Sequence, residues 1–255
     1  TDGEQAYDVD PVTHAVEKAR QAGIVVVVSA GNSGGFLVRP GDSKGLTNPA
    51  RDPFVLTVGA TQTNGTATYT DDTVTALSSL GDGDNNAKRN PDMVAPGRSI
   101  ASLRVPGSFV DEAHGATGRV DEVLFRGSGT SQAAAVVSGA AALLVQQRPT
   151  ATPDQIKRLL MTTATPLAGH TAQSQGAGEI DLRRARVTAT PSYTQSFTRA
   201  KGDGSLDGAR GSHVLSLSGV ELKGDSDIFG QVLKTEDLAA ARNAAINEAV
   251  SDWVL

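Results

Sequence analysis

Two segments of the 255-residue chain combine residue types that could carry out acyl transfer. Ser131 stands where a Gly-rich run, GSGT, enters a long apolar segment, and Asn32 follows a short β-branched run. The first turn of a helix presents free N–H groups and a partial positive charge. A serine placed there could act as a nucleophile, while its own N–H and an Asn amide from a neighbouring loop stabilise a tetrahedral oxyanion. The two segments therefore predict an acyl-transfer site.

The segments that lead to Asn32 predict one half of an α/β repeat. Helical spacing of apolar residues after Pro11 predicts a helix over residues 11–21, and Gly23 ends it. The run Ile24–Val28 is continuously apolar and β-branched, which predicts a strand buried on both faces of a parallel sheet. Asn32 would then lie at the carboxyl end of this strand, where open α/β sheets place their sites. Further strands are expected over residues 54–60, 93–95 and 99–103.

The segment that follows Ser131 predicts a long helix over residues 132–147. This helix is apolar nearly all round, so we expect it to be buried on every side and tightly packed at Gly139. On that expectation, Gly139→Leu would overpack the core. Residues 105–122 are expected to form a loop insertion. Thr152 as N-cap with Pro153 behind it predicts a further helix.

Composition excludes several classes of protein. The net charge of −5 argues against a nucleic-acid binder, which would need a basic face. No apolar run reaches the ~20 residues that span a bilayer. Because the chain has no cysteine, disulfides, Cys-ligated zinc and thiol catalysis are excluded. The chain begins Thr1-Asp2-Gly3, without Met or a signal peptide, and we interpret it as a processed product or a fragment.

Four ordered segments resemble those of the subtilisin-like serine proteases, the subtilases. They are SAGNSGG around Asn32, NPARDPFVLTVGAT, NPDMVAPG, and GSGTSQAAAVVSGAAALL around Ser131. The resemblance extends over residues 11–187 and implies a mostly parallel α/β sheet with helices on both faces, whose N-terminal strands are missing. Residues 1–187 would form the C-terminal portion of the peptidase domain, and residues 188–255 a linker and accessory tail. In that tail we expect a hairpin over residues 213–222 and a helix over residues 235–251.

The resemblance also implies a function, that of a serine endopeptidase that hydrolyses peptide bonds through an acyl-enzyme. It assigns roles to six residues: Ser131 as nucleophile, Asn32 as oxyanion-hole side chain, and Ser29, Ala30, Gly31 and Thr130 in substrate binding. The expected partners are polypeptide substrates, and no cofactor is required. A complete protease of this family would be a monomer located outside the cell or in the cell envelope.

The chain departs from the family pattern in one important respect. The family order of catalytic residues is Asp, His and then Ser, and only 31 residues precede Asn32 here. None of the chain's Asp or His residues stands in the family's context. Its four histidines are better interpreted as surface residues: His14, His114, His170 and His213. Asp92, in NPDMVAPG, is interpreted as a structural residue. Gln132 and Ala135-Val136 replace the family's Met and Pro-His, which we interpret as variation in packing.

Three alternatives stay open at this point. The chain could be a catalytically inactive fragment, pseudoenzyme or interaction module, or a serine hydrolase of another kind. Asp82, Asp84 and Asn86 alternate like the start of a calcium loop, although the later Gly and Glu of such loops are absent. A solvated acidic turn explains these three residues more simply than a calcium site does.

Overall fold

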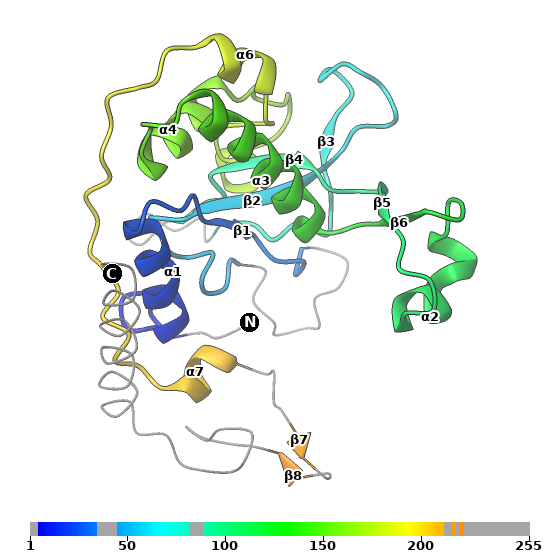
Figure 1. Ribbon diagram of the computed structural model, residues 1–255, viewed down its shortest axis with the longest axis horizontal. Coiled ribbons are helices and arrows are strands. Elements are labelled where there is room, and N and C mark those ends of the chain that lie inside the picture. Colours follow the sequence, from blue (N-terminus) through cyan, green and yellow to red (C-terminus); the bar gives the residue numbers. More distant parts are fainter. Residues whose placement is uncertain (1–4, 35–44, 82–88, 212–215, 218–219, 222–255) are drawn as a thin grey trace, which may run out of the picture.

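The computed structural model describes residues 5–34, 45–81, 89–211, 216–217 and 220–221 (Figure 1). Its helices are α1 (Pro11–Gln21), α2 (Phe109–Gly118), α3 (Thr130–Gln147), α4 (Pro153–Thr163), α5 (Ala172–Gln175), α6 (Leu182–Val187) and α7 (Leu206–Arg210). Its strands are β1 (Val27–Ser29), β2 (Leu56–Gln62), β3 (Thr73–Val74), β4 (Met93–Pro96), β5 (Ile100–Leu103), β6 (Leu124–Gly127), β7 (Ser216–Leu217) and β8 (Val220–Glu221). No helix in the described part of the chain is long and apolar enough to cross a membrane.

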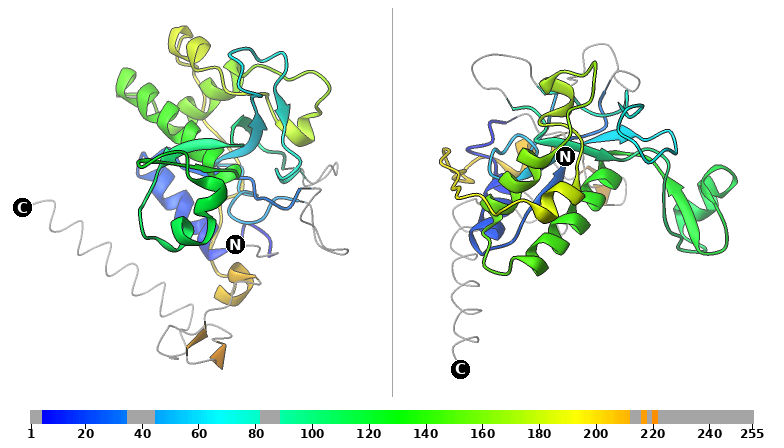
Figure 2. Two further views of the ribbon diagram at one scale, coloured as in Figure 1. Left: turned by 90° about the vertical axis from the view of Figure 1, so that its right-hand side faces the viewer. Right: turned by 90° about the horizontal axis from the view of Figure 1, so that it is seen from above.

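The main sheet has the parallel pairing that the sequence predicts. β2 pairs in parallel with β1 on one side and with β4 on the other, while β3 pairs antiparallel with the end of β2. Helices α3 and α4 lie on one side of this sheet, and α1 lies on the other (Figures 1 and 2). The main hydrophobic core lies between the sheet and α3, α4 and α6. The α/β fold class is therefore confirmed.

The first helix and strand match the sequence only in part. α1 has the predicted bounds, and the Asp10 side chain caps it by accepting a hydrogen bond of 2.7 Å from the Thr13 N–H. The strand, however, begins only at Val27, and Ile24 is 56% exposed. The expectation that Ile24–Val28 is buried on both faces is therefore wrong. Within the described residues β1 pairs only with β2, so β1 is an edge strand and its side chains are covered incompletely.

Helix α3 is buried along one stripe only, whereas the sequence had indicated burial on every side. Its buried residues include Ala133, Val137 and Leu144, which pack against the sheet and α4. Val136 and Leu143 lie on the opposite face and are exposed. Gly139 also lies there, and a Cβ added at Gly139 would meet no atom within 4 Å. The predicted close packing at Gly139 is therefore wrong.

We expect Gly139→Ala to raise the free energy of unfolding by about 1 kcal/mol. Glycine in a helix interior is less favourable than alanine by that amount, and here the added methyl group has open space. Chemical denaturation followed by circular dichroism measures the effect. Gly97→Ala is the contrasting variant, since its Cβ would lie 2.6 Å from that of Ala60. A loss of stability in Gly139→Ala would contradict the open face of α3.

Residues 100–127 form an extension that projects from the body of the fold (Figures 1 and 2). β5 and β6 pair antiparallel, and α2 lies in the connection where the sequence had indicated a loop, with Ser108 as its N-cap. Arg104 fixes α2 to the strands through two contacts with Asp111, of 2.6 and 2.8 Å. β6 leads directly into α3, so the extension is continuous with the segment that contains Ser131.

The chain after α6 returns over the outside of the body. Residues 189–204 contain no helix or strand, yet they make long-range contacts: Gln195 N–H donates to Asp154 and Ala200 N–H donates to Glu17, both at 2.8 Å. The boundary that we expect at residue 188 stays a prediction. β7 and β8 pair antiparallel, which confirms the expected hairpin for the residues described there. The helix expected over residues 235–251 lies outside the described residues.

Candidate active site

The site lies where the loop after β1 meets the start of α3. Gly31 turns the chain after β1 with a φ of +104°, which favours glycine. The Gly129 N–H donates to the Gly97 carbonyl at 2.8 Å and so fixes the entry into α3 to the loop after β4. The end of β1 and the start of α3 thus meet, and Asn32 contacts Thr130, the residue before Ser131.

Asn32 is held in one orientation by Thr130. The Asn32 Oδ1 accepts a hydrogen bond of 2.9 Å from the Thr130 N–H and one of 3.0 Å from the Thr130 hydroxyl. A backbone N–H can only donate, so the atom facing it must be the oxygen and not the nitrogen of the amide. The Asn32 Nδ2 is therefore presented as a donor beside the first turn of α3.

Thr130 supports the site from inside. It is fully buried, and its hydroxyl also accepts a hydrogen bond of 3.2 Å from the Gly31 N–H. Ala30, also fully buried, donates its N–H to the Val58 carbonyl at 2.9 Å. Thr130 and Ala30 thus hold the loop of residues 29–31 against β2 and α3. The geometry gives Thr130 this supporting contact, and a direct contact of Thr130 with substrate stays a prediction.

Ser79 is a supporting residue that the sequence did not reveal. Its N–H donates to the Gly31 carbonyl at 2.9 Å, and its hydroxyl accepts from the Ser33 N–H at 3.1 Å. A Cβ on Gly31 would lie 2.8 Å from that hydroxyl, so a larger residue at Gly31 would force the Ser79 side chain to shift. Ser79 lies 47 residues from Asn32 in the sequence, and no local pattern could have linked them.

Ser131 is exposed at the second position of α3. Among the described residues, neither its N–H nor its hydroxyl has a hydrogen-bond partner. The first N–H groups of a helix have no partner within the helix and point toward its N-terminal end. The Ser131 N–H and the Asn32 Nδ2 are thus two free donors at one helix terminus, where negative charge is favoured.

Two of the described histidines use a ring nitrogen in a contact with another residue. The Nδ1 of His14 is 2.7 Å from the Ala200 carbonyl, and the Nε2 of His170 accepts from the Val74 N–H at 3.3 Å. His114 is exposed on α2, which corrects the expectation that it lies in a loop. His213 lies outside the described residues. Among the described histidines, none forms a hydrogen bond with Ser131.

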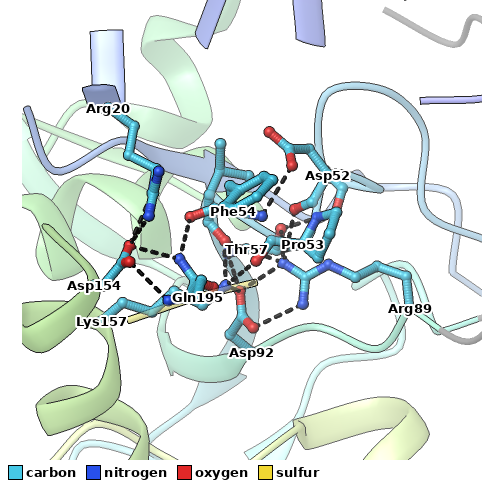
Figure 3. Close-up of polar contacts among 12 residues, drawn as sticks. Arg20, Asp52, Pro53, Phe54, Thr57, Arg89, Asp92, Asp154, Lys157 and Gln195 are labelled. Atoms are coloured by element: carbon cyan, nitrogen blue, oxygen red, sulfur yellow. Dashed lines mark hydrogen bonds and ion pairs between the residues drawn. The ribbon is translucent and has the colours of Figure 1, made fainter. Parts of the chain in front are cut away.

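Asp92 lies in a buried cluster of charges at the start of β4, next to β2 (Figure 3). Its carboxylate accepts two hydrogen bonds of 2.7 Å from Arg89 and one of 2.7 Å from the Thr57 N–H, and Lys157 lies 3.1 Å away. Arg89 and Lys157 hold the pKa of Asp92 below its ordinary value against the effect of burial, whereas burial lowers the pKa of Lys157 to about 8. These contacts agree with the structural role expected for Asp92.

We expect Asp92→Asn to lower the free energy of unfolding by about 3 kcal/mol. The substitution leaves the cations of Arg89 and Lys157 buried without their anion, and uncompensated buried charge is strongly destabilising. Urea denaturation measures the loss. Asp203→Asn, a substitution of an exposed aspartate, controls for the change in net charge. Equal stability of the two variants would show that the cluster does not hold the sheet.

The expected calcium segment, with Asp82, Asp84 and Asn86, lies outside the described residues. Within the described ranges, no group of three or more His, Asp or Glu side chains could hold a metal ion.

Comparison with known proteins decides the family. The model of the Subtilase family matches residues 2–178. The chain belongs to the subtilase family. It is 42% identical over 172 residues to the serine protease AprX of Bacillus subtilis, a match that covers 68% of this chain and 37% of AprX. It is 35% identical over 176 residues to mycosin-1 of Mycobacterium tuberculosis, covering 62% of this chain and 35% of mycosin-1.

Solved structures of subtilases have the same fold. Fervidolysin from Fervidobacterium pennivorans, described as a keratinolytic enzyme related to subtilisin, is 30% identical, with a TM-score of 0.54 over 71% of this chain and 25% of that enzyme. MycP1 is 30% identical, with a TM-score of 0.50 over 69% of this chain and 55% of the other. The subtilase chain thus spans little more than a third of AprX and about half of MycP1.

Proposed function

We propose that this subtilase chain carries the nucleophile and the oxyanion hole of a serine endopeptidase. The observation that carries the proposal is the orientation of Asn32, whose Oδ1 is bound by Thr130 so that its Nδ2 faces the free first turn of α3. In the proposed site, the Asn32 amide and the Ser131 N–H would both donate to an oxyanion next to the Ser131 hydroxyl. Two such donors are what a tetrahedral oxyanion requires.

In the proposed reaction the Ser131 Oγ attacks the carbonyl carbon of a peptide bond. A general base takes the Ser131 proton, and the carbonyl oxygen becomes an oxyanion that accepts hydrogen bonds from Asn32 Nδ2 and Ser131 N–H. Collapse of this intermediate breaks the C–N bond as the base returns the proton to the leaving nitrogen, and the neutral amine leaves. Water then hydrolyses the ester on Ser131. By the family order, the base is a histidine oriented by an aspartate, both of which precede Asn32 in the sequence of a complete subtilase.

The proposed substrates are polypeptides, as the relatives are proteases. The half-buried Ser29 and Gly31, with Ala30 behind them, would form one wall of the pocket for the substrate residue before the scissile bond. A relative that is 38% identical over 155 residues is named as an extracellular serine proteinase of Thermus sp.. On that similarity we propose that the complete protein acts outside the cell or in the cell envelope.

Covalent labelling with a fluorophosphonate tests the assignment of Ser131. In a form of the protein with peptidase activity, mass spectrometry should find the phosphonyl group on the peptide that contains Ser131. Ser131→Ala should abolish the label. Ser138→Ala is the matched control, because Ser138 is an exposed serine on the same helix whose hydroxyl donates to Ala134. A label that persists in Ser131→Ala would refute the assignment.

A non-catalytic role is the second candidate function. The observation that favours it is that none of the described histidines forms a hydrogen bond with Ser131. A pseudoenzyme or interaction module would keep the fold and the loop contacts of Thr130 but would not react with the fluorophosphonate in any form of the protein.

A further inference from the structure

The loop between β4 and β5 lies against the Gly-rich run that leads into α3. The Gly129 N–H donates to the Gly97 carbonyl at 2.8 Å, and the Ser99 N–H donates to the Ser128 hydroxyl at 2.9 Å. Neighbouring residues of the run are therefore tied to the loop by two hydrogen bonds, one in each direction. We call this arrangement the clamp, and it consists of residues 97–99 and 128–129.

The loop side of the clamp is fixed to the main sheet. The N–H groups of Gly97 and Arg98 both donate to the Thr61 carbonyl near the end of β2, at 3.0 and 3.1 Å. A Cβ on Gly97 would lie 2.6 Å from that of Ala60 and 2.8 Å from the Gly129 carbonyl oxygen. A side chain at residue 97 would thus push the loop away from both the sheet and the run.

Ser99 has a backbone conformation that is unusual for serine. Its φ is +56°, in the left-handed region that favours glycine. Such strained residues persist only where their surroundings fix them, and they cluster at functional sites. The ladder of β5 and β6 ends at the pair of Ile100 and Gly127. One residue further along, at the left-handed turn, the Ser128 hydroxyl replaces a backbone group as the acceptor.

The contact between Ser99 and Ser128 is suited to placing the chain and less to stabilising the fold. Both residues are exposed, so water competes with their hydrogen bond and its net contribution to stability is small. Ser128 also stands between Gly127 and Gly129, and glycine leaves the backbone unusually free to move. A run of this composition needs contacts from outside to hold one conformation.

We propose that Ser99 and Ser128 are positioning residues of the proposed peptidase site, an inference that rests on the proposed function. The clamp fixes the Gly-rich run, so that the Ser131 hydroxyl and N–H keep their placement relative to Asn32. The connection is short, because the run continues directly into Thr130, whose N–H donates to Asn32. A displacement of reacting atoms by about 1 Å can lower a rate by about 10²-fold, so a small movement of the run is enough to reduce catalysis.

Kinetics of a form of the protein with peptidase activity test this role. Ser128→Ala removes the acceptor and should lower kcat about tenfold with little change in KM, because the groups that bind substrate remain. Ser128→Thr keeps the hydroxyl and should restore kcat. Ser102→Ala is the matched control, since Ser102 is an exposed serine of β5 whose hydroxyl has no hydrogen bond among the described residues. Wild-type kcat in Ser128→Ala, an equal loss in Ser102→Ala, or no recovery in Ser128→Thr would overturn the proposal.

Substitutions at Ser99 test the backbone conformation independently. Ser99→Gly keeps the N–H and favours the positive φ, so kcat should stay at the wild-type value. Ser99→Val is branched at Cβ and is disfavoured at this φ, so it should turn the N–H away from Ser128 and lower kcat as Ser128→Ala does. Because both changes break the same contact, the double variant should lose no more activity than either single variant. Additive losses, or wild-type kcat in Ser99→Val, would contradict the proposed contact.

Amide hydrogen exchange in the 255-residue chain measures the clamp without any reaction. The Gly129 N–H should exchange at least about tenfold faster in Ser128→Ala than in Ser102→Ala, because local opening of the clamp becomes easier. Equal exchange in the two variants would refute the clamp. Faster exchange with unchanged kcat would refute its role in positioning. Hydrolysis that persists in Ser131→Ala would instead refute the proposed function, and the role of the clamp with it, so the two failures give different results.

Discussion

The 255-residue chain alone is expected to show no Ser131-dependent hydrolysis of casein. A serine hydroxyl is a weak nucleophile unless a positioned base takes its proton. His14 and His170 use ring nitrogens in contacts elsewhere, and His114 is on the projecting α2. In subtilisin, a relative of this chain, loss of the catalytic Ser or His lowers kcat by about 10⁶-fold. The two oxyanion donors alone leave only a residual rate of about 10³–10⁴-fold over water.

The experiment compares the chain with a fusion that supplies the Asp and His motifs of a complete subtilase ahead of residue 1, each with and without Ser131→Ala. Casein hydrolysis should appear only in the fusion that keeps Ser131. Turnover by the chain alone that disappears in Ser131→Ala would mean that one of its own histidines is the base. Matched circular dichroism spectra of the four proteins would ensure that lost activity reflects chemistry and not unfolding.

The sequence indicates the two central residues of the candidate site but not the residues that support them. Asn32 and Ser131 are recognisable because each follows a local pattern, a β-branched run or a Gly-rich run before a helix. Thr130 and Ser79 hold these groups through hydrogen bonds between segments that are distant in the sequence. Such bonds depend on tertiary structure, which residue spacing does not encode.

The errors in the fold have a common physical origin. The apolar composition of α3 indicates a helix but not which of its faces is covered, and the structure leaves Val136 and Leu143 exposed. In the same way, the β-branched run before Ser29 indicates a strand but not whether it has neighbours on both sides. Burial depends on the elements that pack against a segment, so a pattern within the segment predicts its type more reliably than its environment.

The partners of the buried acidic groups are mostly residues that are distant in the sequence, and sequence analysis does not reveal them. Arg89 and Asp92 are three residues apart, so their ion pair could have been predicted from the sequence. Lys157, the other cation of that cluster, comes from α4 and could not. Asp72 and Glu179, two further buried acidic residues, lie 107 residues apart, and neither stands in a motif. Glu179 stands in a segment that also contains Asp181, so no local pattern marks Glu179 as buried.

In a form of the protein with peptidase activity, Asn32→Asp is expected to lower kcat by about 10³-fold while the protein keeps its fold. The aspartate can still accept the hydrogen bonds from the Thr130 N–H and hydroxyl, so the contacts that hold the loop persist. It has no amide hydrogen to donate, and it places a negative charge next to the developing oxyanion. Loss of one oxyanion donor costs about 10²–10³-fold in subtilisin, and the added repulsion places Asn32→Asp at the upper end of that range.

The comparison with Asn32→Ala and Thr130→Val separates catalysis from support. Asn32→Ala loses both the donor and the acceptor, so it should lower kcat and the melting temperature together. Thr130→Val removes the hydroxyl that binds Asn32 and Gly31 but keeps the backbone N–H, and should reduce kcat less than either Asn32 variant. KM should change little in Asn32→Asp, because the donor acts mainly in the transition state. Unchanged kcat in a folded Asn32→Asp protein would show that the Asn32 amide does not contact the oxyanion, and would leave the Ser131 N–H to stabilise it without this second donor.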